Sequence, residues 1–158
     1  MKKFFVTLVV IFFLIILDIF LSRIFPYYLR PNLWIVYTIF VSLFLGHIDA
    51  VITGFFAGAI YDVLHLSFFG VNTLLLTTIG YTFGWLNKRV DETLYSVQIL
   101  SVFLSFIVYH CLHYIVMLIF LGIKQYNFIN LLSIITTFII GFLEIQLLIL
   151  FYKKYKLL

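Results

Sequence analysis

The stretch Gly54-Phe-Phe-Ala-Gly58-Ala-Ile-Tyr-Asp62 lies inside a long apolar segment that runs on to Phe69-Gly70-Val71-Asn72. Gly54, Gly58 and Asp62 are four residues apart, so on a helix they share one face. The two glycines leave that face bare, and another helix backbone can approach it closely. A carboxylate is costly in hydrocarbon, so we expect Asp62 to face protein or water rather than lipid. The spacing therefore predicts a helix that packs closely against a neighbouring helix.

The composition predicts an all-α integral membrane protein. Of the 158 residues, 65% are hydrophobic and only 10% are charged. The apolar residues form runs close to the ~20 residues that a helix needs to cross a bilayer, whereas transmembrane strands would give short alternating segments. We predict one transmembrane domain over residues 1–158, with six spans at about 4–21, 32–45, 50–68, 72–86, 96–121 and 128–151. This arrangement leaves no room for a soluble catalytic or receptor domain.

The net charge is +4, and the basic residues lie at the ends of the predicted spans, as membrane topology requires. This distribution does not indicate a nucleic-acid-binding surface. Six crossings put both termini on one side. That side holds seven basic residues and the other holds three: Lys2, Lys3, Lys88, Arg89, Lys153, Lys154 and Lys156 against Arg23, Arg30 and Lys124. Because cytoplasmic loops are enriched in Lys and Arg, we expect both termini in the cytoplasm. Spans 50–68 and 72–86 are short, so a re-entrant connection at Gly70 stays open.

Several ionisable residues interrupt the apolar runs. At ~1.5 Å of rise per residue, five of them fall at a similar depth in the outer half of the membrane, namely Asp18, Asp62, His65, His110 and His113. They form either one outward-opening pocket or partner contact, or a set of separate hydrogen bonds between helices. Glu144 falls in the inner half. There it either forms an ion pair with Lys88 or Arg89, or reaches the membrane interface, or hydrogen-bonds a neighbouring helix.

The sequence carries no pattern typical of an active site. His110 and His113 share a helix face and could be joined by Asp62 or His65 around a metal, but two histidines at this spacing are common by chance. There is no nucleophile with a base and an orienting group, no phosphate loop and no Cys-x-x-Cys pair. We therefore predict no catalytic, cofactor or metal site. The Gly54/Gly58 pair is compatible with either a protein contact or packing within the chain.

Three motifs in order carry a resemblance: Arg30-Pro31-Asn32-Leu33, then Gly54-x-x-x-Gly58-x-x-x-Asp62, then Phe69-Gly70-Val71-Asn72. Together they resemble the MreD family of rod shape-determining membrane proteins of bacteria. The specific part covers about residues 30 to 85, and the rest is similar in hydropathy and length. The family usually has Asp where this chain has Asn32, which keeps an acceptor for capping a helix but loses the charge.

The resemblance implies a non-enzymatic subunit of the machinery that elongates the lateral cell wall, in the bacterial inner (cytoplasmic) membrane. It implies binding to the bitopic protein MreC and, through it, association with MreB, RodZ, RodA and a class B penicillin-binding protein. The family fold is similar to that of the substrate-binding subunits of energy-coupling-factor transporters. The matching positions, expected to be interface or fold determinants, are Arg30, Pro31, Asn32, Gly54, Gly58, Asp62 and Gly70.

Two functions follow as hypotheses. In the first, the bare Gly54–Gly58 face receives the transmembrane helix of MreC. In the second, the chain is a small-molecule-binding subunit of a vitamin-type transporter, and the outward polar residues bind the ligand. Such subunits often carry Ala-x-x-x-Ala on their first helix, where this chain has only bulky residues at that spacing. That difference favours the scaffold.

Overall fold

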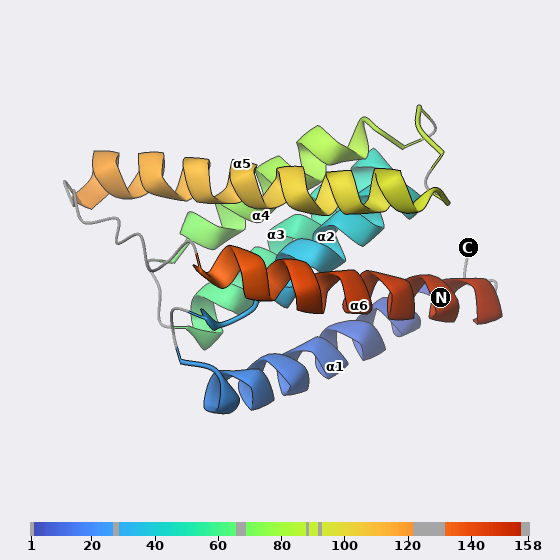
Figure 1. Ribbon diagram of the computed structural model, residues 1–158, viewed down its shortest axis with the longest axis horizontal. Coiled ribbons are helices and arrows are strands. Elements are labelled where there is room, and N and C mark those ends of the chain that lie inside the picture. The colour runs from blue at the N-terminus through green and yellow to red at the C-terminus, as the bar shows by residue number, and fades with distance from the viewer. Residues whose placement is uncertain are drawn as a thin grey trace. The chain divides into compact units, whose positions relative to one another are not determined.

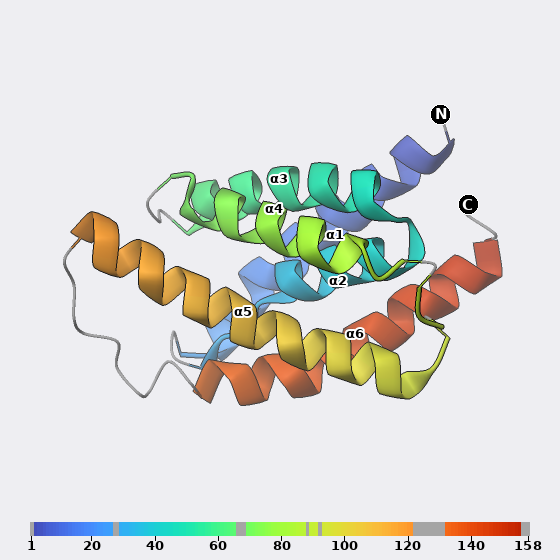
Figure 2. The ribbon, with the colours of Figure 1, turned by 90° about the horizontal axis from the view of Figure 1, so that it is seen from above.

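The computed structural model describes residues 2–26, 29–65, 69–87, 89–91, 93–121 and 132–155. These residues form six helices (Figures 1 and 2): α1 (Lys2–Ile24), α2 (Leu33–Phe44), α3 (His47–Leu64), α4 (Val71–Gly84), α5 (Tyr95–Leu121) and α6 (Leu132–Tyr155). The prediction of an all-helical chain with six helices is confirmed. The helix predicted at 50–68 begins three residues earlier and ends at Leu64. Its last residues, and the predicted start of the sixth helix at 128, lie outside the described residues.

The chain divides into two compact units. One unit comprises residues 1–33 and 128–158, with α1 and α6, and the other comprises residues 34–127, with α3, α4, α5 and nearly all of α2. In the first unit, the start of α1 and the end of α6 lie at the same end (Figures 1 and 2). That placement fits two chain ends on one side of a membrane. The single domain over residues 1–158 stays a prediction.

Three helices in the described part of the chain are long and apolar enough to cross a membrane: α3, α5 over Tyr95–Phe120 and α6 over Ile135–Tyr152. The helix α2 is apolar but shorter. Many large hydrophobic side chains on the long helices are exposed, among them Phe56, Leu104 and Leu147. Exposed apolar surface of this extent is unusual for a soluble monomer and fits contact with lipid. The structure is therefore consistent with a multi-span membrane protein.

The helix α2 is the most buried element. Trp34, Val36 and Ile39 are fully buried. Two of its hydroxyl groups bond to their own helix: the Thr38 hydroxyl donates to the Trp34 carbonyl and the Ser42 hydroxyl donates to the Thr38 carbonyl, each at 2.8 Å. Hydroxyl groups satisfied in this way can be surrounded by apolar side chains.

Candidate functional site

The glycine face of α3 packs against the backbone of α4, which runs antiparallel beside it (Figures 1 and 2). A Cβ atom added at Gly54 would collide with the Leu76 carbonyl, and one added at Gly58 would lie 2.6 Å from the Asn72 carbonyl oxygen. The approach is reciprocal, because a Cβ at Gly80 would collide with the Ala50 carbonyl. The two backbones are in contact because these positions have no side chain.

This packing corrects the prediction that the Gly54–Gly58 face receives a helix of a second polypeptide. The helix α4 of the same chain already covers that face, so the other interpretation, packing within the chain, describes the structure. The partner stripe on α4 was not predicted from the sequence. Its signal was a second pair with the same spacing, Gly80-Tyr-Thr-Phe-Gly84.

Asp62, which is 2% exposed, caps the start of α4. The helix follows Gly70, whose φ of 99° lies in the left-handed region and whose position has no side-chain cap of its own. The Asp62 Oδ2 atom accepts the backbone N–H groups of Gly70 (2.9 Å) and Thr73 (3.1 Å) and the Thr73 hydroxyl (2.8 Å). The Oδ1 atom accepts the backbone N–H (3.1 Å) and side-chain amide (2.8 Å) of Asn72. The carboxylate thus satisfies donors that a helix N-terminus leaves free.

The polar residues at the start of α4 do not cap it themselves. Asn72 and Thr73, whose side chains could cap a helix N-terminus, both donate to Asp62 instead. A carboxylate has about four lone-pair sites, and the five hydrogen bonds fill them. Asp62 is therefore held as a structural group in the described structure.

The network continues from α4 to α5. The Tyr109 hydroxyl donates to the Asn72 side-chain oxygen, and both residues are buried. The ring of Tyr109 lies beside the two histidines of α5, with centroid distances of 5.5 Å to His110 and 6.0 Å to His113. Asp62, Asn72 and Tyr109 thus connect three helices. Asn72 and Tyr109 were not predicted as members, although each is a polar residue inside an apolar run.

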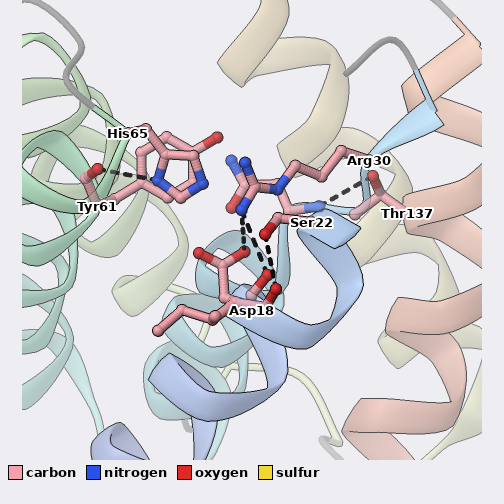
Figure 3. Close-up of polar contacts among 8 residues, drawn as sticks. Asp18, Ser22, Arg30, Tyr61, His65 and Thr137 are labelled. Atoms are coloured by element: carbon pink, nitrogen blue, oxygen red, sulfur yellow. Dashed lines mark hydrogen bonds and ion pairs between the residues drawn. The ribbon is translucent and has the colours of Figure 1, made fainter. Parts of the chain in front are cut away.

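His65, the remaining histidine of the predicted cluster, contacts a residue of α3. The His65 Nδ1 atom lies 3.1 Å from the Tyr61 carbonyl oxygen, and the two rings stack with centroids 4.0 Å apart (Figure 3). Tyr61 belongs to the last turn of α3, and His65 is the residue that ends the helix. This contact describes the end of a helix rather than a ligand site.

Asp18 pairs with Arg30 in the unit that holds α1 and α6 (Figure 3). An Arg30 Nη2 atom lies 3.6 Å from the Asp18 carboxylate and donates to the Asp18 backbone carbonyl at 3.3 Å. Asp18 is buried, and a buried carboxylate is stabilised by a nearby guanidinium. Asp18 and Asp62 lie in different units, so the five-residue cluster as a whole stays a prediction.

Asn32 also acts within this unit. It directly precedes α2, where an Asn is a favoured cap, and its backbone N–H donates to the Thr137 hydroxyl of α6 at 3.2 Å (Figure 3). Pro31 precedes the helix by two residues. Arg30 and Asn32 thus make intrachain contacts that join the segment before α2 to α1 and α6.

Glu144 on α6 is a buried acid. It is 9% exposed, and neither of its carboxyl oxygens has a hydrogen-bond partner in the part of the chain that is described. The hydrogen bond to a neighbouring helix, which the sequence suggested, is therefore not found there. Lys88, one of its expected partners, lies outside the described residues.

The described residues contain no group of three or more His, Cys, Asp or Glu side chains placed to hold a metal ion. The polar groups that the sequence singled out instead fall into two sets. Asp62 belongs to a network that joins α3, α4 and α5, and Asp18 with Arg30 belongs to a pair in the other unit. Both sets bind parts of the chain to one another.

Comparison with known proteins gives the family. A comparison with curated proteins and one with solved structures each gave no match. The family model described as rod shape-determining protein MreD matches residues 1–158. The glycine and Asp62 positions of the α3–α4 pair and the Arg30-Pro31 motif fall within that match, and the chain belongs to the MreD family.

Proposed function

We propose that this chain is a non-enzymatic scaffold subunit of the machinery that elongates the lateral wall of a bacterial cell, resident in the cytoplasmic membrane. The observation that carries the proposal is the family match over residues 1–158. The structure supports a scaffold because the acid of the glycine motif, Asp62, has its acceptor sites filled by the start of α4. A carboxylate held in this way stabilises the fold and is not free to transfer protons.

The proposed direct partner is MreC, a protein with a single transmembrane helix, with MreB, RodZ, RodA and a class B penicillin-binding protein associated through it. The partner list in mild detergent tests this proposal. We expect the tagged chain to retain MreC and other wall-synthesis proteins. Recovery of transporter ATPases in their place would contradict the scaffold and support a transporter subunit.

The contact with MreC is expected on an outward apolar surface, because α4 covers the glycine face of α3. Photo-crosslinking residues placed at the exposed positions Phe56, Leu104 and Leu147 sample α3, α5 and α6 in turn. We expect a crosslink to MreC from one helix and none from the others. Equal crosslinking from all three would indicate random contact in the membrane rather than a docking face.

A substitution at Gly58 separates docking from folding. Because Gly58 faces α4, Gly58→Ile is expected to lower the thermal stability of the isolated chain together with the recovery of MreC. Val63→Ile is the matched control, since Val63 is exposed on the same helix. If Gly58→Ile abolished MreC binding while stability was unchanged, the glycine face would be the docking surface after all.

The transporter alternative has less support. It needs a polar cluster that is open to a ligand, whereas Asp62 and Asn72 are buried and bonded to each other, and Asn72 also bonds to Tyr109. The similarity to energy-coupling-factor subunits is implied by the family and stays a proposal. A thermal-shift screen with vitamins tests it directly, and stabilisation by one of them would revive this function.

A further inference from the structure

The beginning of α3 and the end of α4 lie together. A Cβ atom added at Gly84 would be 2.7 Å from the Cα atom of His47, so the two helix ends meet. The helix α3 is long and apolar enough to cross a membrane. Its first residue is therefore expected at a membrane surface, and the end of α4 lies at the same surface. The chain continues from α4 as tight turns, with the Arg89 N–H donating to the Leu86 carbonyl at 2.9 Å.

Four side chains form a stripe at this surface, which we call the interfacial stripe: His47, Tyr81, Trp85 and Arg89. Tyr81 and Trp85 are each 51% exposed. The guanidinium carbon of Arg89 lies 5.2 Å from the centre of the Trp85 ring, and the rings of His47 and Tyr81 form a T-shaped pair with centroids 4.7 Å apart. Tryptophan and tyrosine favour the level of the lipid headgroups, and an arginine over a tryptophan face is held there by a cation–π interaction.

The positive charge of Arg89 has no carboxylate partner among the residues that the structure describes. The nearest acid along the described chain, Asp91, is bonded elsewhere. Its Oδ1 atom accepts the Thr93 hydroxyl at 2.6 Å and the Thr93 backbone N–H at 3.0 Å, and these hydrogen bonds lower the pKa of Asp91. Arg89 is exposed, so its N–H groups remain open to an anion while its flat face rests on Trp85.

We propose that the interfacial stripe binds the headgroup of an anionic phospholipid. The Arg89 guanidinium donates to the phosphate oxygens, and the half-exposed rings of Trp85 and Tyr81 contact the glycerol region and the upper acyl chains. A soluble phosphate would use only the guanidinium, whereas a lipid also covers the aromatic rings. The exposed aromatic surface beside the charge is the reason to choose a lipid.

The chain offers its own fluorescent reporter for this site. It has two tryptophans, and Trp34 is 0% exposed, so in a Trp34→Phe background the emission comes from Trp85 alone. The protein is reconstituted in phosphatidylcholine vesicles that contain either brominated phosphatidylglycerol or brominated phosphatidylcholine. Bromine quenches tryptophan on contact, so the two mixtures report which lipid lies beside Trp85.

We expect phosphatidylglycerol to be preferred over phosphatidylcholine beside Trp85 by about fivefold. This is the preference that one basic residue near an anionic surface provides. Arg89→Gln should reduce the preference to near one. The matched control is Arg23→Gln, which removes another exposed arginine at the end of α1 and should leave the preference unchanged. Circular dichroism and thermal unfolding check that each variant is folded.

A preference near one in the parent, or the same preference in Arg89→Gln, would overturn the proposal. Loss of the preference on adding inorganic phosphate, but not sodium chloride at equal ionic strength, would assign the site to a soluble anion and would overturn it as well. Native mass spectrometry of the chain with both tryptophans gives an independent readout. Fewer retained phosphatidylglycerol molecules in Arg89→Gln than in Arg23→Gln are expected.

Discussion

Asp62 shows how one residue can mark a membrane helix without being a reactive group. Ionisable residues in membrane spans are expensive, and they are usually taken as signs of a substrate or proton path. Here the carboxylate accepts three backbone N–H groups, one amide and one hydroxyl, all from residues 70–73. The start of α4 needs these acceptors because lipid provides none. The free-energy cost of burying the carboxylate is offset by the hydrogen bonds that it accepts.

The first prediction concerns the chemistry of that cap. Asp62→Asn keeps one acceptor oxygen but turns an amide group toward the donors, so we expect the free energy of unfolding to fall by about 2 kcal/mol. Asp62→Leu leaves all five donors unmet and is expected to lower it further, or to prevent folding. Thermal unfolding in detergent measures both variants.

The matched control for the Asp62 variants is Asp49→Asn, because Asp49 is an exposed carboxylate in the first turn of the same helix. Its loss should change the melting temperature little. Equal losses at Asp62 and Asp49 would contradict the capping role. If Asp62→Asn were as harmful as Asp62→Leu, the negative charge itself, rather than the hydrogen bonds, would be required.

The second prediction concerns Glu144, whose buried carboxyl oxygens have no hydrogen-bond partner within the described residues. Burying such a group without a partner costs about 1–3 kcal/mol. Glu144→Met has a similar length and no charged or strongly polar atom, so we expect it to raise the melting temperature, whereas Glu144→Gln should raise it less. Destabilisation by both variants would show that the carboxyl has a partner in the membrane.

At the scale of the element, the α3–α4 pair depends on four positions without side chains. Gly54 and Gly58 face the backbone of α4, and Gly80 and Gly84 face that of α3. Hydrocarbon gives helices no hydrophobic reason to associate, so close backbone contact and hydrogen bonds hold them together. The pair combines both, because the glycines allow the approach and Asp62 bonds across it.

The third prediction tests the close contact between α3 and α4 through the sign of the stability change that a Gly→Ala substitution causes. On an open helix face, Gly→Ala is stabilising by about 1 kcal/mol because alanine favours the helix. At Gly58 and Gly80 a methyl group would overlap backbone atoms of the neighbouring helix, so Gly58→Ala and Gly80→Ala are expected to destabilise the protein by about 1–3 kcal/mol. Denaturant unfolding in micelles measures the change.

Stabilisation by Gly58→Ala or Gly80→Ala would show that the two helices do not touch as described. The control is Val63→Ile, which adds one methylene group to an exposed position of α3 and should leave stability unchanged. Gly70→Ala is a separate case, because a Cβ there meets nothing within 4 Å and only the positive φ of 99° opposes it.

The sequence predicted the elements well and their partners poorly. Hydropathy located six helices, because a membrane span needs a long apolar run whatever it packs against. The glycine spacing predicted a close contact for α3, but spacing on one helix does not say which helix fills the gap. The pairing of Asp18 with Arg30 was missed for a similar reason, since the two are separated by the turn at Pro26. Likewise, nothing local shows that the acid capping α4 belongs to α3.

At the scale of the whole molecule, polar side chains connect elements inside each of the two units. The Asp62–Asn72–Tyr109 network joins α3, α4 and α5, and in the other unit Arg30 bonds to α1 while Asn32 bonds to α6. Hydrogen bonds between membrane helices each contribute about 0.6 kcal/mol on average. Such bonds specify which helices meet more than they add stability.

The final prediction concerns how the α3–α4 pair meets the membrane. With 18 and 14 residues, these helices rise about 27 Å and 21 Å, against a hydrocarbon core of about 30 Å. The pair is therefore too short for the connection between the two helices, which we call the tip, to extend far beyond the core. It does not need water, because Asp62 accepts the N–H groups of Gly70, Asn72 and Thr73. We expect the tip, with the exposed Phe69, to lie among the outer headgroups.

Labelling with a membrane-impermeant maleimide tests this placement. The chain has a single cysteine, Cys111, so Cys111→Ser gives a background without thiols. Ile24→Cys, at the exposed end of α1, should react from outside the cell, and Leu94→Cys, exposed just before α5, should react only after permeabilisation. Phe69→Cys should react from outside but more slowly than Ile24→Cys. If it reacted only after permeabilisation, or not at all, the α3–α4 pair would be a re-entrant hairpin from the cytoplasm, because a spanning pair must bring its tip to the outer surface.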